Sequence, residues 1–384
     1  LIINSLAYAR YARALQLFAL TSRHELMDPF PAVMRMRLFA LSRRKYQAAL
    51  NLLHYFHPVR PLVRMKPLDA LISRYGGEQQ FASAMNISPQ RCAELAHFFL
   101  GDRPIVLANR KGSIDPVDAM AITWYRLHNQ GTVVEAQLAL GCDESKISAV
   151  FAQVCYTLSA QFFRFLEQPP WVTEPRRFLY DVSIAEAGCP FSAIIGFIDG
   201  VRFDIARPSE GQTEYYTRYT RSHNLLFLAI VFPDGTLSMH GPVVGRHNDI
   251  GALVSLGLVG DGLRAITGDK HFLGGDGIFA QKMLNTPIIT MANTERPGAQ
   301  QQSFSKCRIS VEWLFNVLYQ LFPALHDWHK LKLFGFNTPA HTIRAASVLA
   351  LAHNTIERNC ISQAFCLLPP PLEELFLRGD PPHG

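Results

Sequence analysis

The sequence predicts a protein of the α/β (α+β) class, in which an all-helical N-terminal region precedes a domain built on a mixed β-sheet. Helical patterning fills most of the chain up to about residue 165, and Pro169-Pro170 then mark a boundary. From residue 190, apolar runs of strand length alternate with Gly, Pro and Asp, and helical patterning returns to dominate from Gln301 to Asn359. Strands followed by interleaved helices are typical of a sheet with flanking helices.

Composition and charge limit the class of protein before any motif is considered. The chain has 384 residues, of which 48% are hydrophobic and 18% charged, as in ordinary globular proteins and unlike disordered ones. The net charge of +6 permits a polyanionic partner without requiring one. Seven scattered cysteines without a C-x-x-C spacing argue against a zinc ribbon or a disulfide framework and favour a reducing compartment. No apolar run reaches transmembrane length, so we expect no membrane partner.

Four regions are expected along the chain. Residues 1–110 form a helical, basic N-terminal region, whose densest cluster, Arg43-Arg44-Lys45, suits either a DNA contact or a solvated helix face. The chain begins at Leu1, and its basic first stretch fits either a helix leading into a DNA-binding region or a mitochondrial presequence. Residues 111–168 contain a helix-turn-helix, residues 190–360 form the sheet domain, and residues 361–384 form a loose tail.

The helix-turn-helix candidate lies at residues 131–151. A short helix, VVEAQLAL, meets Gly141, and a second helix begins after Asp143, a suitable N-cap. A glycine between two short helices fits the tight turn of a DNA-reading motif. Plain helical packing is the alternative, and the acids at the start of the second helix would repel phosphate. The DNA reading assigns base or backbone contacts to Ser145, Lys146 and Ser148.

Three acids stand where strands end or where a helix face has its edge. Asp199 follows the apolar run IIGFI, Asp276 follows another short apolar run, and Glu312 lies at the edge of an apolar helix face, one turn from Arg308. Each has a simpler explanation, because Asp-Gly pairs make turns and Glu312 could merely pair with Arg308. If they converge, carboxylate oxygens suit Mg²⁺ or Mn²⁺, and two such ions support phosphodiester cleavage.

The order of these segments resembles the DDE transposases of the PIF/Harbinger type and the nuclease-like proteins derived from them. The likeness covers roughly residues 115–358, including a strand–Pro-Asp-Gly–strand hairpin over residues 226–241. It rests on the order and spacing of Ile198-Asp-Gly-Val201, Gly245-Arg-His-Asn-Asp-Ile250, Gly275-Asp-Gly-Ile-Phe279 with Thr286-Pro287, and Arg308-Ile-Ser-Val-Glu-Trp-Leu-Phe315.

The resemblance implies an RNase H-like fold and a metal-dependent DNA endonuclease or transposase-like protein acting in the nucleus. Asp199, Asp276 and Glu312 would then hold the divalent metal, with Asp249 as a fourth acid that His247 orients. Asp269 is the rival for the second position, but Asp276 has the family's spacing to Thr-Pro. The resemblance also implies DNA as substrate and a separate Myb-like DNA-binding partner.

The chain departs from the family pattern at several positions, which keeps a second function open. Arg202 stands where the family has His or a similar small polar pattern, Asn248 is inserted before Asp249, and Phe279 replaces Tyr. Asn316 and Tyr319 replace the family's Gly and Lys, removing a cation that could touch DNA. The alternative is therefore a domesticated, catalytically silent DNA-binding or scaffold protein. For the nuclease, the basic residues expected to hold the DNA backbone are Arg202, Arg218, Arg221 and Arg246, and ordinary surface charge is the alternative explanation for each.

Overall fold

The structure is a computed structural model, and it describes residues 65–107, 112–280, 285–291, 298–326, 338–357 and 359–377. The described residues belong to one compact unit that begins at Met65. The basic cluster Arg43-Arg44-Lys45 and the rest of residues 1–64 lie outside the described residues.

The first part of this unit is a group of helices whose ends follow local capping rules. Thr132 and Glu135 form a reciprocal capping box, and the Ser88 hydroxyl and the Asp115 carboxylate each accept a backbone N–H in the first turn of their helices. A two-stranded hairpin interrupts the helices, which differs from the all-helical region that the sequence predicts. The elements are α3 (Pro67–Tyr75), α4 (Glu78–Met85), α5 (Pro89–Leu100), β1 (Ile105–Val106), β2 (Ser113–Ile114), α6 (Pro116–His128), α7 (Val133–Leu140) and α8 (Glu144–Glu167).

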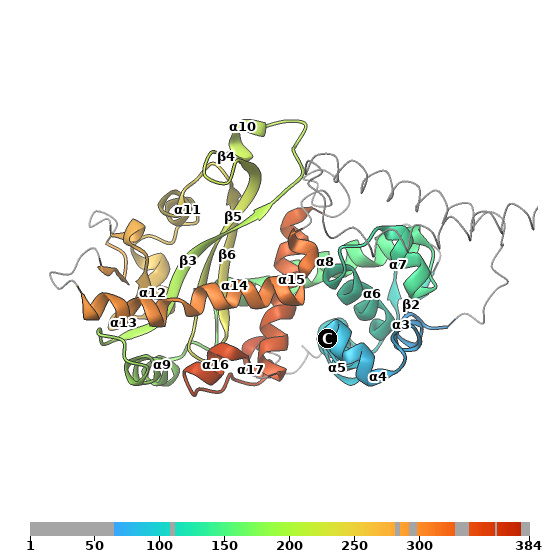
Figure 1. The fold of residues 1–384 in the computed structure, drawn as a ribbon, viewed down its shortest axis with the longest axis horizontal. Coiled ribbons are helices and arrows are strands. Elements are labelled where there is room, and N and C mark those ends of the chain that lie inside the picture. Colours follow the sequence, from blue (N-terminus) through green and yellow to red (C-terminus); the bar gives the residue numbers. More distant parts are fainter. Residues whose placement is uncertain are drawn as a thin grey trace, which may run out of the picture. The chain divides into compact units, whose positions relative to one another are not determined.

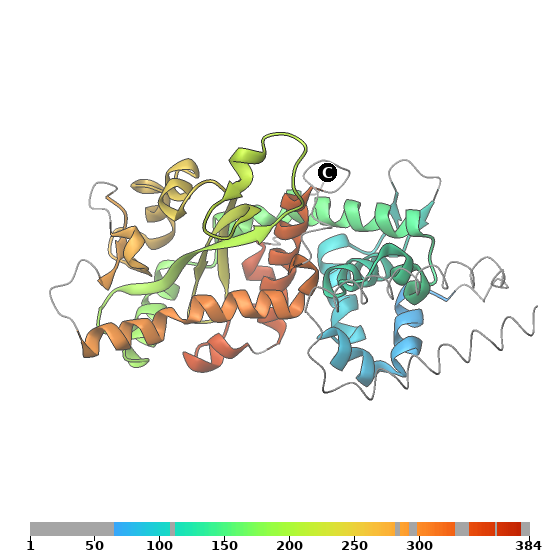
Figure 2. The same cartoon turned by 45° about the horizontal axis from the view of Figure 1, so that its top comes forward.

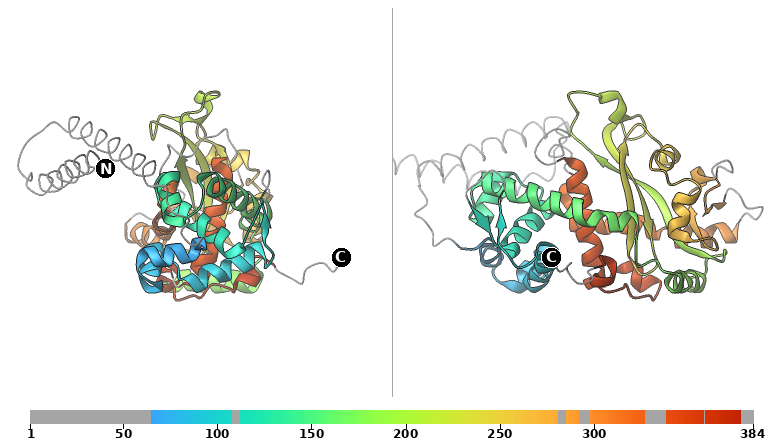
Figure 3. Two further views of the ribbon diagram at one scale, coloured as in Figure 1. Left: turned by 90° about the vertical axis from the view of Figure 1, so that its right-hand side faces the viewer. Right: turned by 180° about the vertical axis from the view of Figure 1, so that it is seen from behind.

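The predicted turn between two helices is present, but the second helix is much longer than expected. Gly141 adopts the left-handed conformation (φ 63°) that ends α7, and α8 begins after Asp143 and runs for 24 residues. Asp143 occupies the N-cap position without making a side-chain capping bond. Buried side chains recur along the whole of α8, which extends from the helical group to the strands and packs against α15 and β6 (Figure 3).

The sheet has five principal strands in the order β6–β5–β3–β7–β8, with the short β4 added to the start of β5. β5 is antiparallel to both β3 and β6, whereas β7 runs parallel to β3 and to β8. This mixed sheet with flanking helices confirms the predicted fold class and is consistent with an RNase H-like fold. The strands are β3 (Ile194–Asp204), β4 (Tyr216–Thr217), β5 (Ser222–Val231), β6 (Leu237–Val244), β7 (Phe272–Gly275) and β8 (Ile288–Ile289).

Helices cover this sheet. α14 packs against β3 and β5, α9 packs against β3, and α8 and α15 pack against β6 (Figures 1 and 2). α13 and α14 follow each other almost without interruption, because Ile309 between them keeps helical dihedrals. These elements are α9 (Glu174–Glu186), α10 (Gln212–Tyr215), α11 (Asp249–Ser255), α12 (Asp261–Thr267), η1 (Gly277–Phe279), α13 (Ala299–Arg308), α14 (Ser310–Leu321), η4 (Pro323–His326) and α15 (Pro339–Ile356).

The two Asp-Gly pairs of the sheet behave differently. Asp234-Gly235 makes the predicted hairpin turn between β5 and β6, and Gly235 has a φ of 78°. Asp199-Gly200 makes no turn: the two apolar runs around it form one strand of 11 residues, and Asp199 pairs with Ala229 in the middle of the ladder. The expectation that Asp199 closes a strand is therefore wrong, and so is its explanation as a turn residue.

The expected loose tail is ordered over most of its length. Residues 360–377 contain α16 (Cys360–Ala364) and α17 (Leu372–Leu375), and they bury Ile361, Leu375 and Phe376 almost completely. Apolar side chains at these positions explain why the segment packs. All seven cysteines lie within the described residues and are free thiols. In the described part of the chain, none of the helices has the length and apolarity needed to span a bilayer.

Candidate active site

Two of the predicted acids lie on neighbouring parallel strands. Ile198 of β3 is in register with Gly275, the last residue of β7; Asp199 continues β3, and Asp276 is the first residue after β7. Asp199 Oδ1 accepts the Gly200 N–H at 2.8 Å, and Asp276 Oδ1 accepts the Gly277 N–H at 2.6 Å, where Asp276 caps the short helix η1. Asp269 precedes β7 and so belongs to the other end of that strand, which favours Asp276 for the second position.

Asp249 is the third carboxylate at this edge of the sheet. The inserted Asn248 is the N-cap of α11: its side chain accepts the Gly251 N–H at 2.8 Å and leaves Asp249 as the first residue of the helix. A Cβ atom at position 200 would overlap the Asp249 carboxylate, so the glycine of β3 permits this close approach. No hydrogen bond from His247 to Asp249 is found among the described residues.

Arg202, which we expected to contact DNA, is engaged inside the protein. Its guanidinium donates to Asn224 Oδ1 at 3.2 Å, to the Gly245 carbonyl at 2.9 Å and to the His247 carbonyl at 2.8 Å. These bonds tie β3 to the loop that leads into α11 and to Asp249. The geometry therefore gives Arg202 a positioning role, and its contact with DNA stays a prediction.

Glu312 reaches this region through Arg308. Arg308 ends α13 and Glu312 lies in the first turn of α14, and the Arg308 Nη2 atom is 3.5 Å from Glu312 Oε1. The same guanidinium lies 3.4 Å from Asp199 Oδ2 through its Nη1 atom. The predicted helical pair is thus confirmed, and the structure adds the contact with Asp199 that sequence spacing did not reveal. The strand ladder and the α13–α14 packing, both tertiary features, create that contact.

The electrostatics of the site are those of crowded, partly desolvated carboxylates. The pKa of Asp199 is raised to about 6: burial is the largest cause and the nearby charges of Asp249 and Asp276 add to it, while the Gly200 N–H and Arg308 oppose the rise. Burial also raises the pKa of Asp249, with Asp276 adding to the rise and Arg202 opposing it. The aspartates repel one another, and the nearby arginines neutralise their negative charge only in part. Carboxylates with pKa values raised in this way are candidates for a functional site.

The donor set of this cluster suits a hard divalent cation, but the described residues do not form a finished cage. Asp199, Asp249 and Asp276 supply only carboxylate oxygens, the ligands that Mg²⁺ and Mn²⁺ prefer. Among the described residues, no three His, Cys, Asp or Glu side chains are gathered closely enough to hold a metal ion together. Glu312 is held by Arg308 and is half-exposed. The aspartates thus fit a metal by their chemistry, and Glu312 would complete the set only by leaving Arg308.

The other predicted DNA-contact residues lie on α8 and around the sheet. Ser145 and Ser148 are exposed in the first turns of α8, and Lys146 between them is half-buried. Arg218, Arg221 and Arg246 are exposed on the sheet side, and Arg218 and Arg246 line one open hollow together with aromatic side chains. Sequence reasoning missed this hollow because its residues come from five separate segments that only the sheet brings together.

Comparison with known proteins shows that part of the chain is similar to a broad enzyme class. Residues 198–354 match the family model described as DDE superfamily endonuclease. This range begins immediately before Asp199 and ends in α15, and it includes all four acids of the site. No curated protein and no solved structure matches the chain significantly. The match supports a nuclease of transposase-like type at the level of the superfamily.

Proposed function

We propose that the protein is a DNA endonuclease or transposase-like enzyme that depends on a divalent metal and uses Asp199, Asp276 and Glu312. The single observation that carries this proposal is the register of β3 and β7, which puts Asp199 and Asp276 next to each other where the β3–β7 pairing ends. The carboxyl end of a parallel strand such as β7 is where α/β sheets bind ligands. The matched superfamily and the uncompensated charge around Asp199 point to the same chemistry.

Each residue has a distinct task in this proposal. Asp199 and Asp276 would hold Mg²⁺ or Mn²⁺, with Asp249 beside them and Glu312 completing the set after release from Arg308. When bound, the metal would activate the attacking oxygen and stabilise the charge that develops on the phosphodiester. The β3 ladder fixes the backbone of Asp199, and Arg202 fixes the loop that presents Asp249. The exposed Arg246 would hold the DNA backbone.

The finer assignments belong to the same proposal. The motif order resembles the PIF/Harbinger type, which implies a nuclear protein that works with a separate Myb-like DNA-binding partner. The exposed face of α8 near Ser145 and Ser148 would add contacts to DNA.

Plasmid nicking by the purified protein with Mg²⁺ or Mn²⁺ tests the proposal. We expect nicking by the intact chain and its loss in Asp199→Asn and Glu312→Gln, which keep side-chain size but remove the charge. Asp269→Asn is the matched control, because this exposed carboxylate lies before β7 and should not affect the reaction. Equal nicking by the intact chain and by both site variants would refute the assignment.

A catalytically silent DNA-binding or scaffold protein is the second candidate, and two features favour it. Arg308 engages both Asp199 and Glu312. Tyr319, in place of the family's Lys, turns inward: its hydroxyl donates to the Arg202 carbonyl at 3.2 Å and its ring stacks on His326 at 3.9 Å. Titration with Mn²⁺ in a calorimeter separates the candidates. A nuclease should bind the metal and lose it in Asp199→Asn, whereas a scaffold should show no binding that depends on Asp199.

A further inference from the structure

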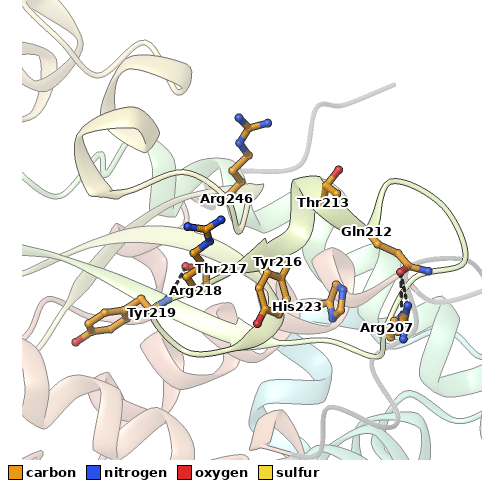
Figure 4. Close-up of a pocket in the computed structure, with 9 residues that line it drawn as sticks. All are labelled: Arg207, Gln212, Thr213, Tyr216, Thr217, Arg218, Tyr219, His223 and Arg246. Atoms are coloured by element: carbon orange, nitrogen blue, oxygen red, sulfur yellow. Dashed lines mark hydrogen bonds between the residues drawn. The ribbon is translucent and has the colours of Figure 1, made fainter.

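An open hollow of about 830 Å³ lies at the end of the sheet that carries α10 and β4. Figure 4 shows its walls, which come from the loop after β3, from α10, from β4 and the turn after it, from β5, and from the loop after β6. Three of the nine lining residues are arginines and none is an acid. The residues that carry the argument are Arg207, Arg218, Arg246, Tyr216, Tyr219 and His223.

The aromatic side chains of this hollow are unusually exposed. Tyr219 is 90% exposed and Tyr216 is 40% exposed, although burying such rings would be favourable. Tyr216 is held in place, because it pairs with His223 across the β4–β5 ladder and their rings meet edge to face at 5.4 Å. One ring is therefore fixed beside a histidine, and the other is presented to solvent as a flat apolar surface.

The arginines supply positive charge around these rings. Arg207 is oriented by two hydrogen bonds from Nε and Nη2 to Gln212 Oε1, at 2.9 and 2.8 Å, which leave further N–H donors of the guanidinium for a ligand. Arg218 and Arg246 are exposed and extend toward the same side of the strands (Figure 4). Arginines beside an exposed aromatic ring are the combination that binds unpaired nucleotides, whose phosphates pair with guanidinium groups and whose bases stack.

A second hollow shares Arg246 with the first. It is also lined by Glu214, His247 and Asn248, and Asp249 is the next residue in the sequence. A strand whose phosphates follow Arg218 and Arg246 would thus be led toward the edge of the sheet where Asp199 and Asp276 lie.

We propose that this hollow binds an unpaired segment of a DNA strand, with a base stacked on Tyr219 and the backbone held by Arg218 and Arg246. The proposal rests on the proposed nuclease function and specifies the form of its substrate. A base inside a duplex has both faces covered by its neighbours, so stacking on Tyr219 requires a nucleotide that is flipped out or lies in a single strand.

Fluorescence anisotropy with the full chain in EDTA tests the proposal without any cleavage step. The probes are a labelled oligothymidylate of about 12 nucleotides, within the site sizes of single-strand-binding proteins, the same strand with abasic residues at its centre, and a duplex of equal length. We expect Tyr219→Ala to weaken binding of the intact strand by about 10-fold, from the loss of one stacked base. Binding of the abasic strand and of the duplex should change little, and Tyr219→Trp should retain affinity.

Phe178→Ala is the matched control, because Phe178 is 63% exposed on α9, at the opposite end of the sheet from α10 (Figures 1 and 3). Unchanged binding of the intact strand by Tyr219→Ala would overturn the proposal, as would an equal loss with the abasic strand or the duplex. A protein that fails to nick plasmid but shows this Tyr219 dependence would refute the nuclease and leave the strand site standing. Nicking activity together with strand binding that does not depend on Tyr219 would support the nuclease and refute the strand site.

Discussion

The Arg308 guanidinium contacts Asp199 across the space between α13 and β3, with Nη1 lying 3.4 Å from Oδ2. The same side chain also holds Glu312. One cation therefore connects two of the three carboxylates of the proposed triad. The stability of the fold should report this arrangement independently of any enzyme assay.

Replacing Asp199 should change how stability depends on pH. The folded-state pKa of Asp199 is raised from 3.8 to about 6, so its contribution to stability is complete below about pH 4 and is lost as the pH rises through about 6. Asp199→Asn should therefore be more stable than the intact chain at pH 7 by ~1–2 kcal/mol. This range is below the limit of about 3 kcal/mol for two pKa units, because the carboxylate keeps some solvent. Urea unfolding at pH 4.0 and 7.0, near the two ends of the pH range over which this contribution is lost, measures the effect. The difference in free energy of unfolding between Asp199→Asn and the intact chain should be smaller at pH 4.0 than at pH 7.0. The exposed Asp269→Asn control should show no such convergence.

Removing Arg308 should affect stability through Asp199. Arg308→Gln removes the cation that opposes the raised pKa of Asp199, and we expect a loss of about 1 kcal/mol at pH 7, the upper range for a partly buried pair. In the Asp199→Asn background the same change should cost less, and the double-mutant cycle measures the coupling between the two side chains. Additive effects would show that the 3.4 Å contact contributes nothing.

Tyr180 should stabilise the β5–β6 hairpin through its hydrogen bond to Asp234 in the turn. Asp234 is fully buried, and its carboxylate accepts the Tyr180 hydroxyl at 2.6 Å and both the N–H and the hydroxyl of Thr236. Tyr180→Phe would leave this buried group short of one donor, which should cost about 1–3 kcal/mol in free energy of unfolding. Urea unfolding checks the value. Tyr156→Phe, at an exposed position on α8, should stay within about 0.5 kcal/mol of the intact chain.

Variants of Arg202 and Arg246 should distinguish a residue that positions the Asp249 loop from a residue that binds DNA. Arg202→Lys cannot reproduce three hydrogen bonds in a planar fork, so nicking should slow by about 10-fold or more while affinity for duplex DNA is unchanged. Arg246→Gln should instead weaken DNA binding and reduce its salt dependence by about one phosphate contact. Nicking rates and anisotropy titrations at two salt concentrations distinguish them. Weaker duplex binding by Arg202→Lys would show that Arg202 contacts DNA, as the sequence suggests.

Patterns local in sequence predicted much of this architecture. Apolar runs located the strands, Asp234-Gly235 located the hairpin turn, and the spacing of Arg308 and Glu312 gave their helical pair correctly. Errors arose where long-range packing overrode a local signal. Asp199-Gly200 looks like a turn, but both residues pair with β5, which continues the ladder through them to Asp204.

The site was predictable in its residue types and less so in its contacts. The acids were identified by their positions next to apolar runs. The Asp199–Arg308 contact and the internal role of Arg202 depend on which strands and helices become neighbours, which sequence spacing does not encode. Likewise, α8 was expected to be short, because the tertiary contacts with α15 and β6 that extend it are not visible in its first two turns.

The length of α8 sets the distance that this helix spans between the helical group and the sheet. Its 24 residues span roughly 36 Å at 1.5 Å per residue. Its first turns carry Ser145 and Ser148 on the surface, and near its far end the Leu166 carbonyl accepts the Ser238 hydroxyl of β6. The helix therefore joins the helical group to the sheet as one continuous element. If the proposed function holds, DNA bound at Ser145 and Ser148 would lie at a fixed distance from the sheet that carries the carboxylates.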